Sequence, residues 1–393
     1  MTTFPPMPLL SITSPSTIAA CRNFPLRPSD TFICSYPKSG TTWTQHICLT
    51  LLLAERKYKI AASTDGDGNS NASSTDGDGD GDLAYNHVSD YAPFFEIDAH
   101  WQSSSSSSDD NTKILAESVR KNHDRLGRRV FNTHLRWDML PKQREANGDT
   151  QQNNQDANMR NERPQCGKFI YVTRNQIDVV ASFYHHLSNQ KEGTYTDTYE
   201  AFLRDWMDGK VPFGCSLHHL IGFAGAFADN LYDTTDVGDD GPISSNTSGS
   251  GMMDQLLLLL SYEKMKVNLR SEVLRIISFL NLTHIPSNVL EEEILPSFEF
   301  SSMKNNIGKF QPKSVGWLNG FQFLRRGVAG DGKKLLLNKS ANDGGEEEGE
   351  SSDLMDVYND WVEREEYCSK ISNALQGNSN EDCREVFLGV VEN

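Results

Sequence analysis

Short, continuous apolar runs alternate along this chain with longer segments in which apolar residues recur at helical spacing. The runs are rich in β-branched and aromatic residues, which is typical of strands that are buried on both faces. The pattern predicts strands at 31–36, 129–133, 168–173 and 255–262, and helices at 42–57, 113–127, 177–187, 198–208 and 269–281. Strands that alternate with helices predict an α/β fold, a single domain with a central parallel sheet flanked by helices.

Several stretches interrupt this pattern with Gly, Ser, Asn and Asp. Such residues cannot bury enough apolar area to offset the entropy of ordering them, so we expect disordered insertions. They lie at about 62–83, 102–112, 143–165, 233–252 and 338–353. We therefore expect a disordered tail at 1–22, followed by one domain at 23–393 that carries these insertions.

The acidic residues are concentrated in loops rather than spread over the chain. The stretches 64–82, 229–240 and 341–353 together hold 17 acidic residues, as many as the net charge of −17. The remainder of the 393 residues is close to neutral. The acidity therefore indicates solubility and disordered loops, and nucleic-acid binding is disfavoured.

The cysteines and the apolar runs indicate the compartment. Seven cysteines are scattered without a CxxC pair or a zinc spacing, which favours reduced thiols in a cytoplasmic protein. The leucine run at 256–260 is too short to span a bilayer, so no stable membrane insertion is expected. A disordered tail is favoured for the Ser-, Thr- and Pro-rich N-terminus, with organelle targeting as the alternative.

One turn concentrates groups that bind anions. In the segment 34–53, CSYPKSGTTWTQHICLTLLL, a strand meets an apolar helix through a turn that contains Lys38 and several hydroxyl residues. The ammonium, the hydroxyls and the backbone N–H groups at the helix N-terminus can converge on one phosphate or sulfate group. The nucleotide P-loop pattern GxxxxGK[ST] is absent, because Lys38 precedes Gly40.

This turn, YPKSGTTW, resembles the 5′-phosphosulfate loop of the cytosolic sulfotransferases, which use 3′-phosphoadenosine 5′-phosphosulfate as donor. Other segments resemble the family's motifs in the same order along the chain. They are NFPLRPSDTFICSYPKSGTTW at 23–43, APFFE at 92–96, FNTHL at 131–135, YVTRNQIDVVASFYHH at 171–186, LLLLSYEKMK at 257–266 and FLRRGVAGDGKK at 323–334. The resemblance covers most of the non-insertion sequence and implies the P-loop-like sulfotransferase fold and a sulfotransferase activity.

The resemblance also implies which residues hold the donor. They are Lys38, Ser39, Gly40, Thr41, Thr42, Trp43, Arg174, Ser182, Tyr262, Phe300, Met303, Arg325, Arg326 and Gly327. Their chemistry agrees with these roles. The fork of Arg174 suits a phosphate, and Ser182 lies about two helical turns further on, where it can face the same site. Trp43 and Phe300 would sandwich the adenine, with Phe298 as the alternative register.

For catalysis, the resemblance implies His134 as the general base and Lys38 as the group that stabilises the leaving phosphate. No metal is required by this scheme. The acceptor is expected to be a small, hydrophobic molecule with a hydroxyl or amine, in a pocket near 213–227. Candidate residues of this pocket are Phe94, Phe95, Trp137, Tyr184, His185 and Phe213.

Three departures from the family pattern leave alternatives open. Asn132 stands where the family usually has Lys, Gly332 stands where it has Trp, and no C-terminal dimerisation motif follows Lys334, so the oligomeric state is unknown. A weakened family member that binds a nucleotide or a partner is one alternative. A small-molecule P-loop kinase is another, although it predicts a hydroxyl directly after a Gly-Lys pair and an acid that holds magnesium.

Overall fold

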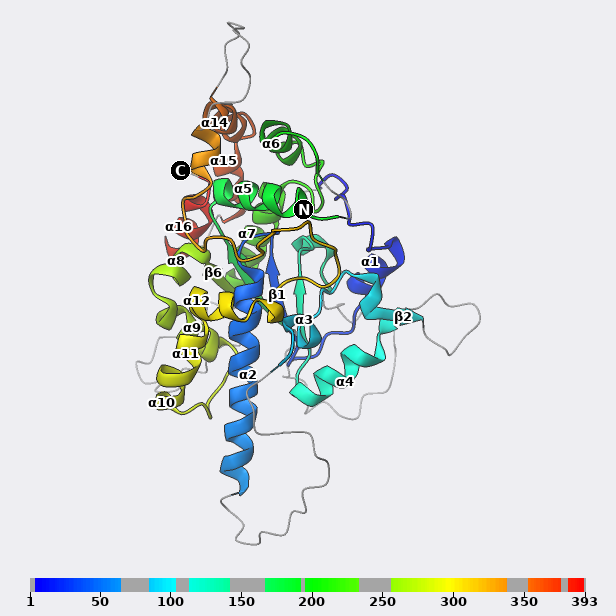
Figure 1. The fold of residues 1–393 in the computed structure, drawn as a ribbon, viewed down its shortest axis with the longest axis vertical. Helices are drawn as coiled ribbons and strands as arrows, with labels where there is room; N and C mark the ends of the chain where they lie inside the picture. The colour runs from blue at the N-terminus through cyan, green and yellow to red at the C-terminus, as the bar shows by residue number, and fades with distance from the viewer. Residues whose placement is uncertain are drawn as a thin grey trace, which may run out of the picture.

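The computed structural model describes residues 4–64, 85–103, 113–141, 167–191, 195–232, 256–337, 353–375 and 381–391. The predicted insertions lie almost entirely outside these ranges. A four-stranded parallel sheet forms the centre of the fold (Figure 1). Its strand order is β4-β1-β5-β6. Its strands are β1 (Thr31–Ser35), β4 (Val130–Thr133), β5 (Lys168–Thr173) and β6 (Leu257–Ser261). Each predicted sheet strand is therefore present, and the α/β class is confirmed.

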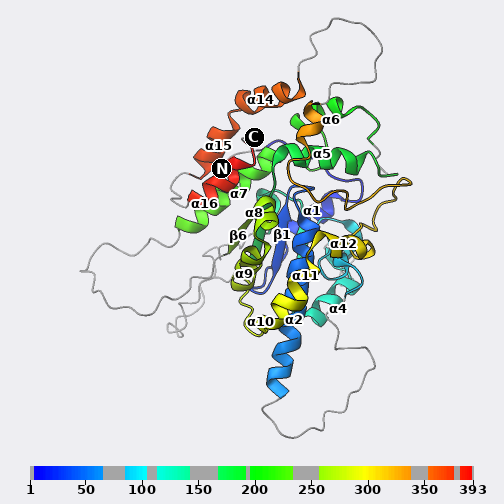
Figure 2. The same ribbon diagram turned by 60° about the vertical axis from the view of Figure 1, so that its left-hand side comes forward.

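Helices cover both faces of the sheet, because alternate strand residues point to opposite sides and both sides are apolar (Figure 2). One face packs against α1 (Pro15–Arg22), α5 (Gln176–Leu187), α6 (Tyr199–Met207), α7 (Ser216–Tyr232), α14 (Leu354–Arg364), α15 (Tyr367–Ala374) and α16 (Glu381–Gly389). The other face packs against α2 (Thr41–Thr64), α3 (Val88–Tyr91), α9 (Leu269–Phe279) and α10 (Ser287–Val289).

The remaining elements are short. They are β2 (Trp101–Ser103), β3 (Lys113–Leu115), α4 (Glu117–Leu126), α8 (Tyr262–Val267), α11 (Leu295–Ser297), α12 (Phe300–Asn305), α13 (Lys333–Leu337), the 3₁₀ turns η1 (Asp98–His100), η2 (Trp137–Met139) and η4 (Ile307–Lys309), and the π-helical turn η3 (Leu290–Ile294). The predicted helix at 113–127 is wrong at its start. Residues 113–115 form β3, which pairs antiparallel with β2, and only the later residues form α4.

The N-terminal segment also differs from the prediction of a disordered tail. Residues 15–22 form α1, which Ser14 caps by accepting the N–H of Thr17. The Ser14 hydroxyl donates to Asp98 Oδ1 at 2.7 Å, and Lys113 lies 3.3 Å from the same oxygen. Contacts with distant residues therefore order this segment, which its local composition does not reveal.

No helix in the described ranges is both long enough and apolar enough to cross a membrane. The five cysteines whose side chains are described are free thiols.

Candidate active site

The carboxyl ends of the parallel strands open into a cavity of about 580 Å³. Ligands of open α/β sheets bind at this edge, outside the strand ends. The predicted residues that line the cavity are Lys38, Gly40, Thr41, Thr42, Trp43, Phe94, His134, Arg174, Ser182, Phe213, Tyr262, Phe300, Met303, Arg325, Arg326 and Gly327. The structure therefore brings together residues that are almost 300 positions apart in the chain.

The turn between β1 and α2 has a backbone that only glycine fits at one position. Lys38 and Gly40 both have positive φ, 71° and 110°, which bends the chain sharply before α2 begins at Thr41. A Cβ atom on Gly40 would lie 2.9 Å from Cδ2 of Tyr262. Because the close approach and the positive φ both exclude a side chain, the turn stays small. Ser39 is buried behind the turn and does not line the cavity.

Lys38 forms no ion pair with an acid among the described residues. Its Nζ lies 3.2 Å from Nδ1 of His186 and 4.7 Å from the ring centroid of Phe323. Burial, together with the nearby charge of Arg174, lowers the pKa of Lys38 to about 7. An anion in the cavity would restore the charged form of this lysine.

Arg174 follows β5 and is held from three sides. Its Nη1 donates to the carbonyl of Lys38 at 3.1 Å, its Nη2 lies 3.5 Å from Asp178, and the guanidinium stacks 4.4 Å from the ring centroid of Tyr262. Its Nε is buried and has no hydrogen-bond partner among the described residues. The contacts of the guanidinium thus fix the orientation of the fork at the cavity wall.

The second cationic loop is docked onto α5 through Asp178. This buried carboxylate accepts the N–H groups of Gly330 and Gly332, each at 2.7 Å. A Cβ on Gly332 would lie 2.3 Å from the carbonyl oxygen of Ile177, so the backbone of this loop packs directly against the start of α5.

Two arginines of that loop share one acid. Arg325 donates to Asp331 at 2.8 Å, and Arg326 pairs with the other oxygen of the same carboxylate. In the same loop, Gly327 has φ 63° and lies against the ring of Phe300.

Trp43 and the two candidate phenylalanines occupy different environments. Phe298 also lines the cavity, but it is fully buried, and its carbonyl accepts the indole N–H of Trp43 at 2.9 Å. Phe300 begins α12 and touches Gly327 at the cavity wall. Tyr262 packs edge-on against Trp43, with ring centroids 5.6 Å apart. Phe300 therefore has the more accessible ring of the two, next to the cationic loop.

His134 lies just beyond the end of β4, and its ring is fixed in one tautomer. Its Nδ1 lies 2.8 Å from the Ser35 carbonyl oxygen, which can only accept, so Nδ1 carries the proton. The lone pair is then on Nε2. Burial is the main reason that the pKa of His134 is lowered to about 4, and the charge of Lys38 lowers it further. The imidazole is therefore neutral at physiological pH and can accept a proton.

A buried carboxylate positions the backbone of His134. The segment before Glu96 runs parallel to β4, since Phe95 donates its N–H to the carbonyl of Asn132 at 2.9 Å. Glu96 then accepts the N–H of His134 at 2.8 Å. Burial raises the pKa of Glu96 to about 7. The Asn132 side chain donates to the carbonyl of Ala92 at 2.8 Å and does not line the cavity.

The apolar part of the cavity lies around the His134 ring. Phe94 and Phe213 flank it at centroid distances of 5.2 and 5.1 Å. Residues 9–12 of the N-terminal segment line the same space. Phe213 donates its N–H to the carbonyl of Pro8 at 2.8 Å, which holds this segment in place.

The structure does not bring the other expected acceptor residues, Phe95, Trp137, Tyr184 and His185, to the cavity wall. Phe95 is buried against Phe32 and Phe131. Trp137 packs on Phe169 and Phe223, and Tyr184 packs in an aromatic cluster with Tyr195 and Tyr199.

Four features of the site had no assigned role in the sequence: His186, Asp178, Glu96 and residues 9–12. The first three lie inside motifs quoted above, whereas residues 9–12 carry no motif. Among the described residues, no group of three or more His, Cys, Asp or Glu side chains is arranged to hold a metal ion.

Solved structures of similar architecture include mouse sulfotransferase SULT7A1 complexed with PAP and retinol dehydratase in a complex with retinol and PAP. Both are 18% identical to this chain with a TM-score of 0.49. The alignments cover 96% of this chain and 95% of the first structure, and 93% of this chain and 87% of the second.

Sequence relatives cover most of the chain. Sulfotransferase 1E1 of Cavia porcellus is 25% identical over 323 residues, which are 81% of this chain and 82% of the relative. Amine sulfotransferase of Oryctolagus cuniculus is 26% identical over 319 residues, 79% of this chain and 76% of the relative. The family model for the sulfotransferase domain matches residues 28–147, 162–230 and 252–343. These matches span well over half of the chain, which therefore belongs to the sulfotransferase family and is an enzyme that transfers a sulfuryl group.

Proposed function

We propose that this enzyme moves a sulfuryl group from 3′-phosphoadenosine 5′-phosphosulfate to a hydroxyl or amine of a small, hydrophobic acceptor. One observation carries the proposal: Lys38, which has no acid partner among the described residues, and the neutral imidazole of His134 face the same cavity, between an anion-binding turn and an apolar chamber. The names of the relatives, which act on amines or luciferin, agree with a small acceptor.

The residues at the nucleotide end fit a donor with several phosphates. Lys38 and the N–H groups at the start of α2 would hold the 5′-phosphosulfate. Arg174 and Ser182 would hold the 3′-phosphate together with the loop at 325–327. Trp43 and Phe300 would enclose the adenine, and Tyr262 and Met303 would complete that wall.

The donor supplies the sulfuryl group, and the residues of this chain move the proton and hold the charge. Nε2 of His134 would take the proton of the acceptor hydroxyl as the oxygen–sulfur bond forms. Lys38 and the N–H groups of the turn would stabilise the negative charge on the phosphate oxygen as the old sulfur–oxygen bond breaks. The products are a sulfate ester, or a sulfamate from an amine, and adenosine 3′,5′-bisphosphate.

The chamber around His134 favours a flat apolar acceptor. Phe94, Phe213 and the leucines at 9 and 10 present apolar surface on several sides of the imidazole. A phenol can place its ring between the phenylalanines while its hydroxyl points at Nε2. We place the enzyme in the cytoplasm, since its described cysteines form no disulfide and the relatives include a cytosolic sulfotransferase of Arabidopsis thaliana.

Transfer of labelled sulfate from the donor to a panel of phenols, alcohols and amines tests this function. We expect turnover with at least one phenol, and a loss of about 10²–10⁴-fold in kcat for His134→Ala. Binding of adenosine 3′,5′-bisphosphate should persist in that variant, because His134 lies at the acceptor end. Unchanged turnover in the variant would rule out His134 as the base. Donor binding without transfer to any acceptor would favour a binding protein.

A further inference from the structure

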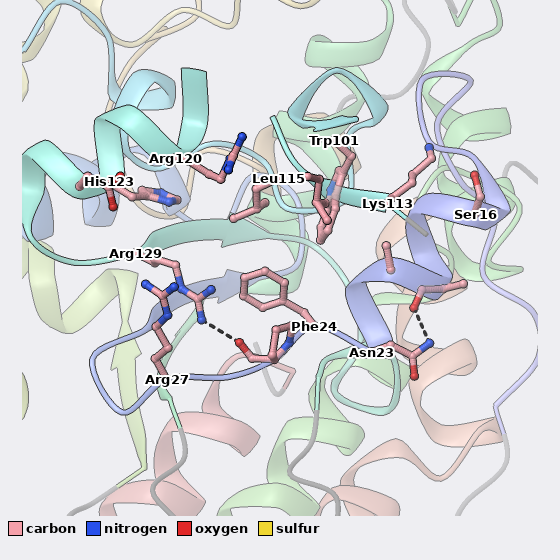
Figure 3. Close-up of a pocket in the computed structure, with 15 residues that line it drawn as sticks. Ser16, Asn23, Phe24, Arg27, Trp101, Lys113, Leu115, Arg120, His123 and Arg129 are labelled. Atoms are coloured by element: carbon pink, nitrogen blue, oxygen red, sulfur yellow. Dashed lines mark hydrogen bonds between the residues drawn. The ribbon is translucent and has the colours of Figure 1, made fainter. Parts of the chain in front are cut away.

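Two cavities differ in how their cationic side chains are arranged. One, of about 920 Å³, lies among α1, the β2–β3 ribbon and α4, and among the described residues none lines both this cavity and the active site. Its arginines Arg27 and Arg120 lie on different sides of Phe24 and do not converge on one group (Figure 3). In the active-site cavity, by contrast, the ammonium of Lys38 is held by side chains from two other parts of the chain.

One of these side chains, His186, reaches the active-site cavity from α5. It lies four residues after Ser182, about one helical turn further along, so both side chains are on the face that lines the cavity. The helix is fixed at its start, where the Asn175 side chain accepts the N–H groups of Ile177 and Asp178. A side chain on a regular helix is placed more precisely than one on a loop, so α5 presents the imidazole at a defined position.

Aromatic rings of one loop pack against the His186 imidazole. Trp317 meets it edge-on, with ring centroids 5.0 Å apart, and Phe323 lies at 6.2 Å. This loop is tied to the end of α5, since Leu318 donates its N–H to the carbonyl of Asn189 at 2.9 Å. The imidazole is therefore held between its own helix and the loop.

The ammonium of Lys38 lies between this imidazole and a phenylalanine ring. Its Nζ is 3.2 Å from Nδ1 of His186 and 4.7 Å from the ring centroid of Phe323. An ammonium group can only donate hydrogen bonds, so Nδ1 accepts and the proton of the neutral imidazole is on Nε2. The flexible four-carbon stem of a lysine would otherwise let the charge occupy many positions. These two contacts therefore fix the place of the Lys38 charge in the cavity.

We propose that His186 is a positioning residue for sulfuryl transfer, because its Nδ1 accepts a hydrogen bond from Lys38 and aims the ammonium at the phosphate oxygen that loses the sulfuryl group. This role rests on the proposed function, in which Lys38 stabilises the charge on that oxygen. The same hydrogen bond stabilises the charged form of Lys38, since an acceptor favours an ionised donor. Loss of the imidazole should therefore weaken nucleotide binding most at high pH, where Lys38 takes up a proton on binding.

The groups that face Lys38 leave it as the one that titrates near neutral pH. Within the described part of the chain they are Arg174 after β5, His134 after β4 and His186 on α5. The guanidinium stays charged. Burial lowers the pKa of both imidazoles, with the charge of Lys38 as a further cause, so both are neutral above pH 6. Burial lowers the pKa of Lys38 to about 7, which lies inside the range of the test below.

Titration calorimetry of adenosine 3′,5′-bisphosphate into the full chain tests this role. The variant His186→Phe keeps a ring against Trp317 and removes the acceptor. We expect it to weaken binding about tenfold at pH 9 but only about twofold at pH 6, because a hydrogen bond to a charged group is lost and Lys38 is already charged at the lower pH. His186→Asn should stay within about threefold of wild type at both pH values, since its Oδ1 can replace Nδ1 as the acceptor but cannot act as a base.

Two further comparisons separate this role from a general disturbance of the cavity. In a Lys38→Met background, His186→Phe should cost less than about twofold, because both residues act through one contact. His218→Phe is the matched control, since His218 lies on α7 and does not line the cavity, and it should bind within about twofold of wild type. The thermal midpoint of each variant reports folding, and His186→Leu removes the same acceptor if His186→Phe does not fold.

Four results would overturn the role of His186. They are wild-type affinity of His186→Phe at pH 9, an equal loss at pH 6 and pH 9, no recovery in His186→Asn, and additive losses in the Lys38→Met background. A wild-type chain that does not bind the nucleotide at either pH refutes the proposed function itself, and the role of His186 with it.

Discussion

Binding of adenosine 3′,5′-bisphosphate is expected to transfer a proton from solvent to Lys38. Burial and the charge of Arg174 lower the pKa of Lys38 to about 7, so at pH 7 about half of the free enzyme carries this charge. A phosphate dianion beside the ammonium stabilises the charged form and moves the pKa back toward its ordinary value of about 10.4.

The magnitude follows from these two pKa values. Proton uptake per ligand should be about 0.5 at pH 7 and about 0.9 at pH 8, because the bound state keeps a proton that the free state loses as pH rises. Affinity should therefore decrease with pH, by up to about 50-fold between pH 7 and pH 9. Below pH 7 the effect fades, because Lys38 is then charged in both states.

Titration calorimetry in buffers of different ionisation enthalpy measures this uptake directly. The phosphates of the ligand titrate near pH 6, so they are ionised over most of this range. Lys38→Met should bind more weakly and lose most of the pH dependence, whereas His134→Ala should keep it. If the wild type showed no buffer-dependent heat and constant affinity between pH 7 and pH 9, the pKa of Lys38 would not be lowered to about 7 in the free enzyme.

Three further substitutions test other contacts of the site. Burial raises the pKa of Glu96 to about 7, whereas its ordinary value is 4.5. Between these two pH values the folded state holds a proton that the unfolded chain has lost. The free energy of unfolding should therefore fall by about 3 kcal/mol as the pH rises through this range. Glu96→Gln should remove that slope in urea denaturation measured across this range. Gly327→Ala places a Cβ 2.4 Å from the ring of Phe300 and should weaken nucleotide binding by about tenfold or more in titration calorimetry. Gly330→Ala is the control, because Gly330 also has positive φ but lies in open space, and it should weaken binding less. Asp178→Asn should reduce nucleotide affinity by about tenfold, because the Asp178 carboxylate holds the cationic loop through two backbone N–H groups. The thermal midpoint of unfolding, measured in parallel, separates misfolding from weaker binding.

The strands and the anion-binding turn could be predicted because their signals are local. The predicted strand at 168–173 coincides with β5, and the predicted strand at 31–36 ends one residue beyond β1. Parallel strands place their carboxyl ends at one edge, so the motifs that follow them must meet there. Residues 113–115 could not be predicted in this way, since their strand conformation depends on pairing with β2.

The acceptor pocket was less predictable, because aromatic residues serve both cores and binding sites. Phe94 and Phe95 are neighbours in the chain, yet their side chains lie in different surroundings. Phe94 faces His134, while Phe95 packs in the core. Sequence alone does not reveal which of the two points inward. The N-terminal residues 9–12 escaped prediction for a related reason, since contacts with distant residues hold them in place.

The distribution of charge suggests how the proposed site would compensate for Asn132, which stands where the resemblance to the family implies a lysine. Asn132 is buried, and its amide is engaged with Ala92, so this position offers no cation to a leaving phosphate. The outer arginines are partly neutralised by acids, with Asp331 between Arg325 and Arg326. Lys38, in contrast, has no acid partner among the described residues. Its lowered pKa shows that the charged form is destabilised at this place. A ligand that brings its own negative charge relieves that cost, so binding of the nucleotide itself would charge Lys38 at the point where the leaving phosphate develops its charge.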